Sequence, residues 1–366
     1  MDIGILLILI TTAIATSVLG VFLVLRKMSM IVDSISHTVL LGIVIAFLFI
    51  QDLASPLLII GAALMGIITV FLTELLVKSK KASEESATGL VFPLLFSIAI
   101  ILISSKFKNV HLDLDVVLLG KIELAPFDKI FIGGISIGPK LFYIMLVVMI
   151  INLLFTKLFF KELKIISFDV ALAATLGFIP FIIHYLLMTL VSLTAVSAFS
   201  AVGSILVIAL MIGPPATALL FSKDLKKMLL VSIIIGVINS ILGYILAIFI
   251  DVNISGMIAT VTLLMFLIVL AFEPKKGIIS TIIKRYKLKD EFTFLILVFH
   301  VHNHAGIESE IKCENIQKEL KWSKNICKKQ IDRGLKSGIF IIENNLVHLT
   351  SIGNDFYNLK ANELRV

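Results

Sequence analysis

Long apolar stretches follow one another through the first three quarters of the chain. About nine approach or exceed the roughly 20 residues that cross a bilayer as a helix. They are 3–25, 35–50, 56–77, 88–104, 141–160, 178–199, 201–222, 228–250 and 254–272, with the run 178–222 divided around Ser200. Hydrophobic residues make up 59% of the sequence, against about 45–50% in soluble domains. We therefore expect an all-α polytopic membrane protein with about eight or nine transmembrane helices.

Basic residues in the short loops predict the orientation of these helices, because Lys and Arg are enriched on the cytoplasmic side. They cluster at 26–27, 78–81, 157–164, 223–227 and 275–276. With nine spans, all these clusters fall on one side of the membrane. We expect the N-terminus outside and the C-terminus inside, in a bacterial inner or plasma membrane. The apolar start at Ile3, without a basic region before it, predicts a first membrane helix rather than a removed signal peptide.

A change in composition near residue 275 divides the chain into two predicted domains. From Lys275 onward the sequence holds 16 of its 32 Lys and Arg residues, and the long apolar runs stop there. We expect a transmembrane domain over 1–275 and a small cytoplasmic domain over 280–366. In the latter, 293–301 is a strongly apolar start, 313–320 and 323–337 have helical periodicity, and two apolar runs flank an Asn344-Asn345 turn, which indicates a hairpin. This order of elements is typical of an α/β winged-helix-like domain.

Asp33 and His37 are the first candidate site residues. They are four residues apart, so they share one face of a helix. Ionisable groups near a membrane span are costly and usually functional, and an oxygen together with an imidazole nitrogen suits Mn²⁺, Zn²⁺ or Fe²⁺. Two ligands complete no metal site by themselves, and Asp33 as a helix cap with His37 facing a pore is the alternative. The ligand types do not decide which of the three metals is used.

Several blocks of the sequence resemble the zinc/manganese/iron permease family of ABC transporters. The blocks are Arg26 to Ser29 with Asp33 to His37, Glu84 to Gly89, His111 to Gly120, Phe168 to Gly177, and Ala201 to Ala216. Val32 departs from the glycine common before the aspartate. The resemblance covers roughly 1–275 and implies a type II importer-like fold, in which Asp33 and His37 line the metal path. Glu85 is a weaker candidate for that path, with a solvated charge at a helix start as the alternative.

The resemblance also assigns a role to the segment on the predicted cytoplasmic side that contains Phe168, Asp169, Ala171 and Gly177. It implies a short coupling helix that docks on an ATPase subunit. The alternative is an ordinary connecting turn without such a role. The implied partners are ABC ATPase subunits, a second permease as a copy or a homologue, and an extracellular metal-binding lipoprotein. The chain has no G-x-x-x-x-G-K-[ST] loop for phosphates, since Gly120-Lys121 is followed by Ile122. A separate protein must therefore bind ATP by that route.

Two further features of the membrane domain allow two interpretations each. Gly213, Pro214 and Pro215 interrupt a long apolar run, and proline removes a backbone donor, so the segment is a hinge near the pathway or a packing kink. His184 lies alone in an apolar span, where a hydrogen-bonded packing residue is commoner than a ligand. In the predicted loop 105–140, which we expect against the outer face, His111, Asp113 and Asp115 gather cations or form a solvated loop.

The tail adds two candidate sites. Helix 323–337, with Lys324, Lys328, Lys329, Arg333 and Lys336, has the place of a recognition helix, but its charges equally suit a solvated face or anionic lipid headgroups. His300, His302 and His304 form a dense cluster, either a regulatory metal site or a partly exposed helix end. On a helix only His300 and His304 share a face. We do not expect nucleic acid as a partner.

We therefore predict the permease subunit of an ATP-driven importer of divalent transition metals, with no resident cofactor and no chemistry catalysed by this chain. A membrane-anchored, metal-responsive DNA-binding regulator is one alternative, which requires a tail that binds specific DNA. A proton-coupled metal transporter is another, which requires no ATPase partner.

Overall fold

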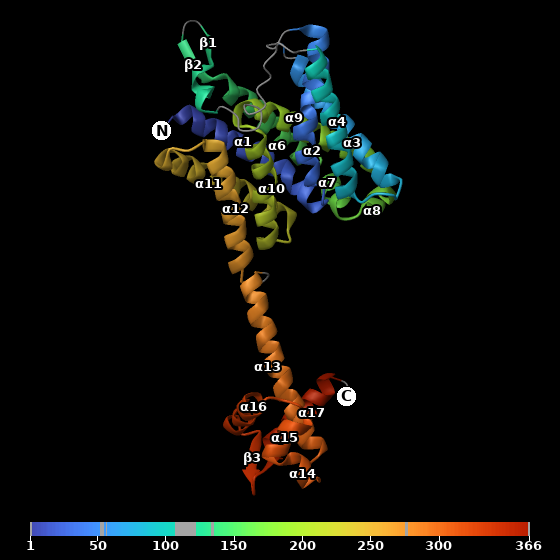
Figure 1. Cartoon of the computed structure of the whole chain (residues 1–366), viewed down its shortest axis with the longest axis vertical. Helices are drawn as coiled ribbons and strands as arrows, with labels where there is room; N and C mark the ends of the chain where they lie inside the picture. Colours follow the sequence, from blue (N-terminus) through green and yellow to red (C-terminus); the bar gives the residue numbers. More distant parts are fainter. Residues whose placement is uncertain are drawn as a thin grey trace. The chain divides into compact units, whose positions relative to one another are not determined.

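The computed structural model describes residues 2–51, 55, 57–106, 122–132, 135–274 and 277–364. The chain divides into two compact units, Met1–Glu273 and Pro274–Val366, each with its own core (Figure 1).

Unit 1 is built almost entirely of helices. Nine helices in the described part of the chain are long and apolar enough to span a membrane. Their bounds are α1 Ile3–Leu25, α2 Met30–Ile50, α3 Leu57–Lys78, α4 Glu84–Lys106, α6 Lys140–Leu158, α9 Pro180–Val202, α10 Ser204–Phe221, α11 Leu225–Ile250 and α12 Ile254–Phe272. The prediction of an all-α polytopic membrane protein is thereby confirmed.

Two helix boundaries differ from the sequence-based expectation. α2 begins at Met30 rather than near residue 35, so Asp33 and His37 both lie within the helix. Hydropathy underestimates the length of this helix because its first turns are polar. Backbone hydrogen bonds form in these turns regardless of side-chain polarity, so the helix includes them. The long run 178–222 breaks at Gly203 rather than at Ser200, where a φ of 77° ends α9 and starts α10. Glycine adopts this left-handed region without a Cβ penalty.

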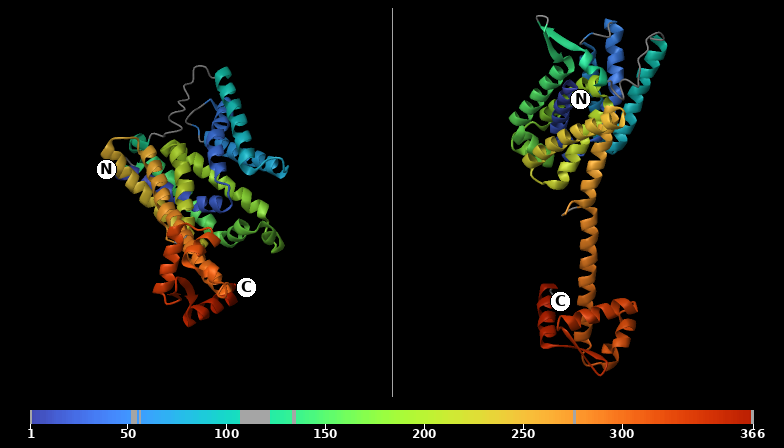
Figure 2. Two further views of the ribbon diagram at one scale, coloured as in Figure 1. Left: turned by 60° about the horizontal axis from the view of Figure 1, so that its bottom comes forward. Right: turned by 90° about the vertical axis from the view of Figure 1, so that its left-hand side faces the viewer.

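The helices of unit 1 pack into two hydrophobic clusters. The larger one centres on α1, which packs against α6, α10 and α11. The smaller one joins α2, α3 and α4 through residues such as Leu41, Met65 and Val91. These three helices lie side by side at one side of the unit (Figures 1 and 2).

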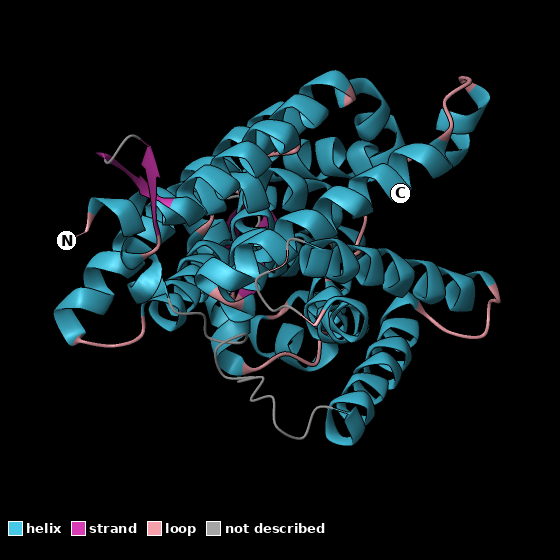
Figure 3. Ribbon diagram, turned by 90° about the horizontal axis from the view of Figure 1, so that it is seen from above, coloured by secondary structure: helices cyan, strands magenta, loops and turns pink. Residues whose placement is uncertain are grey.

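The described part of the segment before α6 packs against the helices, and its position on the outer face stays a prediction. It contains a 3-10 turn, η1 Ile122–Phe127, and an antiparallel hairpin of β1 Lys129–Ile132 and β2 Ile135–Pro139 (Figure 3). Ile122 is fully buried. The Glu123 carboxylate accepts a hydrogen bond from the Ile254 amide at 3.4 Å, at the start of α12. His111, Asp113 and Asp115 lie outside the described residues.

The described part of unit 2 contains five helices and a hairpin around a small apolar core. Their bounds are α13 Ile278–Asn303, α14 Glu308–Ile311, α15 Cys313–Glu319, α16 Lys324–Lys336, β3 Phe340–Glu343, β4 Leu346–Leu349 and α17 Ser351–Leu364. The core joins residues such as Phe294, Leu297, Ile331 and Phe340. The hairpin turns at Asn344 and Asn345, with φ of 48° and 68°, as a type I′ turn requires.

The predicted elements of the tail are therefore present in the predicted order. α13 starts 15 residues before the apolar segment at Thr293, and α17 was not predicted. The identification of unit 2 as a winged-helix-like domain stays a prediction.

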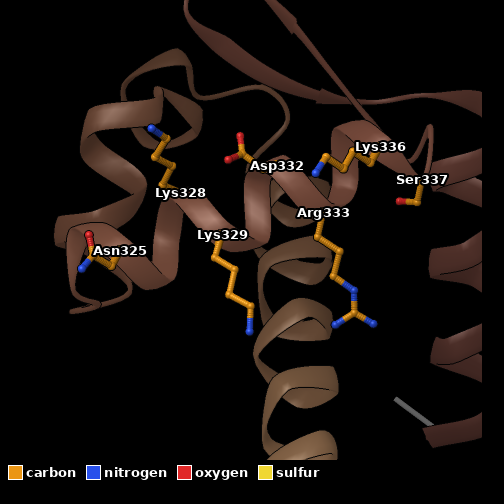
Figure 4. Close-up of a pocket in the computed structure, with 7 residues that line it drawn as sticks. All are labelled: Asn325, Lys328, Lys329, Asp332, Arg333, Lys336 and Ser337. Carbon is orange, nitrogen blue, oxygen red and sulfur yellow. The ribbon is translucent and has the colours of Figure 1, made fainter.

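A carboxylate on α13 holds α16 in place. Asp290 Oδ1 accepts hydrogen bonds from Lys329 Nζ at 2.7 Å and Gln330 Nε2 at 2.8 Å, and Oδ2 accepts one from Arg333 Nη1 at 2.9 Å. Arg333 also lies over the Phe294 ring, 4.7 Å from its centroid. In Figure 4 Lys329 and Arg333 extend toward α13, whereas Lys328 and Asp332 point to the opposite side. Two basic residues of the predicted recognition helix thus serve internal packing.

Asp290→Asn should destabilise unit 2 at neutral pH by about 1 kcal/mol, the scale of a partly exposed charge network. The hydrogen bond from Lys329 holds the pKa of Asp290 below its usual value. A lowered folded-state pKa contributes stability above the unfolded pKa, and that stability is lost as the pH falls through the folded pKa. The difference in free energy of unfolding between the wild type and Asp290→Asn should therefore be full at pH 7 and shrink below about pH 4.

Trp322, the chain's single tryptophan, packs against the core of unit 2 and reports its unfolding within the full-length protein. Asp355→Asn, which removes an exposed carboxylate of α17, is the matched control. A destabilisation of Asp290→Asn that does not change with pH would contradict the assignment.

Candidate functional site

Asp33 and His37 form an open pair on an otherwise buried stretch of α2. His37 Nε2 lies 3.6 Å from Asp33 Oδ1. The side chain of His37 is 33% exposed and that of Asp33 is 39% exposed, whereas every other residue from Ile31 to Leu41 is buried. The spacing of four residues therefore places an oxygen and an imidazole nitrogen together on the accessible face of a membrane helix.

Two aromatic rings of α4 hold the His37 imidazole. The ring stacks on Phe92 at a centroid distance of 5.3 Å and meets the edge of Phe96 at 5.9 Å. Such contacts restrict the rotation of the imidazole while its Nε2 stays near Asp33. Sequence reasoning did not identify Phe92 and Phe96, because phenylalanine in an apolar span carries no distinguishing pattern.

Among the described residues, the pair by itself does not make a complete metal site. Among the described residues no group of three or more His, Cys, Asp and Glu side chains is arranged to hold a metal ion. Mn²⁺, Zn²⁺ and Fe²⁺ take four or more ligands. Within the part of the chain that the structure describes, the pair therefore has no third protein ligand.

Glu85, the weaker candidate, lies in the first turn of α4 and is exposed. Its neighbour Glu84 is half-buried instead and faces a cavity of about 210 Å³. Met28, Thr73 and Glu74 also line this cavity. The inward acidic residue of the block is thus Glu84, while Glu85 occupies the solvated position at the helix start, where acidic residues are favoured.

A buried polar network joins α1, α3 and α9. Glu74 Oε1 contacts His184 Nε2, and Glu74 Oε2 accepts a hydrogen bond from the Tyr185 hydroxyl at 2.9 Å. Arg26 Nη2 lies 2.8 Å from His184 Nδ1, and Lys78 Nζ lies 3.6 Å from Glu74 Oε2. His184 is thus a hydrogen-bonded packing residue, the commoner of the two interpretations of a lone histidine.

The chemistry of arginine fixes the proton on His184. A guanidinium only donates hydrogen bonds, so Nδ1 of His184 must accept from Arg26. The imidazole is then neutral and carries its proton on Nε2, from which it donates to Glu74. Sequence reasoning missed Glu74, although a lone carboxylate deep in the span 56–77 is itself a signal that a partner exists.

The segment between α7 and α9 presents an apolar surface. α7 covers Phe160–Phe168 and α8 covers Val170–Thr175, and the Asp169 carboxylate between them caps α8 by accepting from the Leu172 amide at 2.9 Å. Phe168 is 63% exposed, Leu172 49% and Leu176 56%.

Gly177 ends α8 with a φ of 85°. The Phe178 amide bonds back to the Ala173 carbonyl, and the Gly177 amide to the Ala174 carbonyl, in the manner of a Schellman cap. Ala171 lies exposed on this short helix. The sequence therefore builds a rigidly capped helix whose apolar side chains face outward.

Gly213, Pro214 and Pro215 lie inside the continuous helix α10 and form close packing contacts. A Cβ at Gly213 would overlap Thr262 of α12. Pro214 frees the Leu210 carbonyl four residues earlier, and Ser17 Oγ of α1 donates to that carbonyl at 3.5 Å. These contacts favour the packing interpretation, and a hinge stays a prediction.

The three histidines of the tail do not converge. His300 and His304 share one face of α13, with ring centroids 4.5 Å apart, and His304 Nε2 lies 3.1 Å from Glu310 Oε2. His302 points elsewhere and stacks on Tyr357 of α17 at 3.6 Å. The helical geometry thus separates the cluster that the sequence suggested as one regulatory site.

Comparison with known proteins places the membrane unit in a family. The model of the ABC 3 transport family matches residues 3–273. The manganese transport system membrane protein MntD of Bacillus subtilis is 40% identical over 282 residues, covering 77% of this chain and 95% of that protein. The zinc transport system membrane protein TroD of Treponema pallidum is 39% identical over 356 residues, covering 96% and 97%. The similarity to TroD therefore extends through unit 2.

A solved structure supports the same relationship. One chain of PsaBC from Streptococcus pneumoniae, determined in complex with a Fab, superposes with a TM-score of 0.61 at 31% identity, covering 75% of this chain and 92% of that one. Family model, relatives and fold agree over the nine helices and the blocks that contain Asp33 and His37. The chain belongs to the ABC 3 transport family.

Proposed function

We propose that this chain is the permease subunit of an ATP-driven importer of Mn²⁺, Zn²⁺ or Fe²⁺ in the bacterial plasma membrane. The observation that carries the proposal is the Asp33–His37 pair, at the two open positions of a buried stretch of a membrane helix. The names of the family members that match most of the chain, which specify manganese and zinc transport, agree with this ligand chemistry.

The pair acts by replacing part of the water shell of the cation. A carboxylate compensates one of the two charges, and a neutral imidazole donates its Nε2 lone pair. Because the described residues bring only two such ligands together, we infer that a second permease facing α2 completes the path. That subunit is a second copy or a homologue, and B. subtilis has two related membrane proteins of manganese transport, MntD and MntC, at 40% and 31% identity to this chain.

The α8 segment is the proposed docking site for a separate ATPase. Its exposed apolar side chains Phe168, Leu172 and Leu176 suit a cleft in another protein, and α8 leads within four residues into α9, the helix of His184. Motion of the ATPase would thereby reach the polar network that joins α9 to α3. Alternating access at Asp33 and His37 then releases the cation inward.

The remaining assignments follow from this topology. The N-terminus lies outside, unit 2 lies in the cytoplasm, and a metal-binding lipoprotein delivers the cation on the outer side. A DNA-binding role for unit 2 has little support, because Asp290 engages Lys329 and Arg333 of α16.

Reconstitution with its ATPase tests the proposal. The complex in liposomes should take up radiolabelled manganese, zinc or iron only with ATP. Leu172→Asp, which places a charge in the apolar docking surface, should lose the ATPase during purification and abolish uptake, whereas Asp355→Asn in unit 2 should keep both. Uptake driven by a proton gradient without ATP would overturn the proposal in favour of a secondary transporter.

A further inference from the structure

The first half of α13 carries an exposed apolar stripe. Its members are separated by one, three or four residues along the turns of the helix and therefore share one helix face. They are Ile278, Ile279, Ile282, Ile283 and Tyr286, whose exposed fractions are 51%, 41%, 47%, 49% and 72%. Leu288 and Phe292 lie on another side of the helix, so the stripe ends at Tyr286.

Nothing within unit 2 covers this stripe in the part of the chain that the structure describes. The residues of α13 that are buried in the core of unit 2 are Phe294, Leu297, Val298 and Val301, all in its second half. Figure 2 shows the shorter elements of unit 2 gathered around that second half. A stripe of large side chains is thus left open on a helix whose other end is firmly packed.

Basic residues border the stripe on both sides. Arg285 lies beside one edge of the helix face and Lys287 beside the other, Lys289 follows the stripe beyond Tyr286, and no acidic residue occurs in α13 before Asp290. Basic side chains at the edge of an apolar stripe, with a tyrosine inside it, are typical of helices that lie in the headgroup region of a bilayer.

Chain connectivity keeps the stripe near the membrane. The last candidate span ends at Phe272 and α13 begins at Ile278, with five residues between them. Five extended residues reach about 18 Å at most. The linker therefore limits how far Ile278, the first residue of the stripe, can lie from the end of the last span.

We propose that the segment Ile278–Lys289 of α13 is an interfacial helix that binds the anionic phospholipid surface of the cytoplasmic leaflet. The apolar stripe enters the boundary between headgroups and acyl chains, and Arg285, Lys287 and Lys289 contact lipid phosphates. This anchors unit 2 at the membrane. The inference rests on the proposed cytoplasmic position of unit 2 but not on metal transport.

A second copy of the chain fits the stripe less well. From Ile278 to Tyr286 it extends only about 12 Å, and the charged residues at its edges are all basic. Two such helices pairing through the stripe would bring like charges together along both edges, which is unfavourable. The same charges are attracted to an anionic bilayer.

Lipid-quenching measurements on the full-length protein test the proposal. The two native cysteines, Cys313 and Cys327, are free and are replaced by serine and alanine, and a single fluorescent label is attached after Ile282→Cys. Thr281→Cys, one residue earlier, about 100° round the helix and outside the apolar stripe, is the matched control. The variants are reconstituted in phosphatidylcholine vesicles with and without phosphatidylglycerol. Spin-labelled lipids and aqueous acrylamide serve as quenchers.

In vesicles with phosphatidylglycerol, the label at 282 should be quenched by the spin-labelled lipid and shielded from acrylamide, and the label at 281 should show the opposite pattern. The substitution Lys287→Gln, which removes one positive charge, should lower the ratio of membrane-bound to free helix about fivefold. This is the effect of one basic residue near an anionic surface. High salt should also lower this ratio, because it screens the attraction between the basic residues and the anionic lipids.

Equal exposure of both labels to acrylamide in anionic vesicles would overturn the proposal. Shielding of position 282 that is identical without phosphatidylglycerol would also overturn it, because the charges would then have no role. Disulfide cross-linking of Ile282→Cys between copies, with no lipid quenching, would assign the stripe to a second copy instead. None of these outcomes depends on uptake, so they stay separate from a failure of the proposed function.

Discussion

Asp33→Asn is expected to lower metal uptake by about 100-fold or more, while the protein folds and retains its ATPase. Even residues that only hydrogen-bond to metal ligands cost 10–100-fold in affinity when changed, and Asp33 is proposed as a ligand itself. The substitution keeps the shape of the side chain but removes the charge that compensates the cation. Uptake of radiolabelled metal into liposomes that contain the complex is the measurement.

The controls separate a lost ligand from a lost fold. Asp33 is 39% exposed and its recorded ion-pair partner is His37, so the melting temperature should change little. Glu85→Gln, at the exposed start of α4, should leave uptake near the wild-type rate. His37→Ala should match the defect of Asp33→Asn, because both ligands serve one site. Normal uptake by either Asp33→Asn or His37→Ala would remove the pair from the metal path.

Local patterns made the spans and the ligand pair predictable from sequence. The nine apolar runs appear as helices because a lipid environment requires internal hydrogen bonding of the backbone. Asp33 and His37 could be paired in advance because a spacing of four residues is a property of a single helix. The Asn344-Asn345 turn of the hairpin was equally local. In each case the responsible residues are close in sequence.

Contacts between distant segments were not predictable in the same way. Glu74, His184 and Arg26 come from three helices, and their sequence separations of 110 and 158 residues carry no periodic signal. Phe92 and Phe96 stack on His37 from another helix, and phenylalanine is ordinary in a span. The full length of α13 was not predicted because its first half is amphipathic and packs on nothing within the described part of unit 2. The apolar content of the sequence therefore indicated only the second half of this helix.

Glu74→Ala should destabilise unit 1 by about 2–3 kcal/mol, because it leaves buried donors without their acceptor, at a cost of about 1–3 kcal/mol for such a group. Glu74 and His184 are only 19% and 8% exposed. Without the carboxylate, the Nε2–H of His184 and the Tyr185 hydroxyl lose their acceptor. The largely buried Arg26 guanidinium also loses the attraction of the negative charge on Glu74. Because stabilities of 5–15 kcal/mol are typical of folded proteins, a large fall in the melting temperature should follow in circular dichroism. Trp322 fluorescence, which reports on unit 2, should not change.

Two companion substitutions distinguish the charge from the shape of the network. Tyr185→Phe deletes one hydroxyl that donates at 2.9 Å and should cost about 1 kcal/mol. Glu74→Gln keeps an acceptor for His184 but removes the negative charge near Arg26, so its cost should lie between those of Tyr185→Phe and Glu74→Ala. If Glu74→Gln were as stable as the wild type, hydrogen bonding alone would hold α3 to α9. If Glu74→Ala were no worse than Tyr185→Phe, the network would not contribute to the stability of unit 1, and its three helices would be joined by apolar packing.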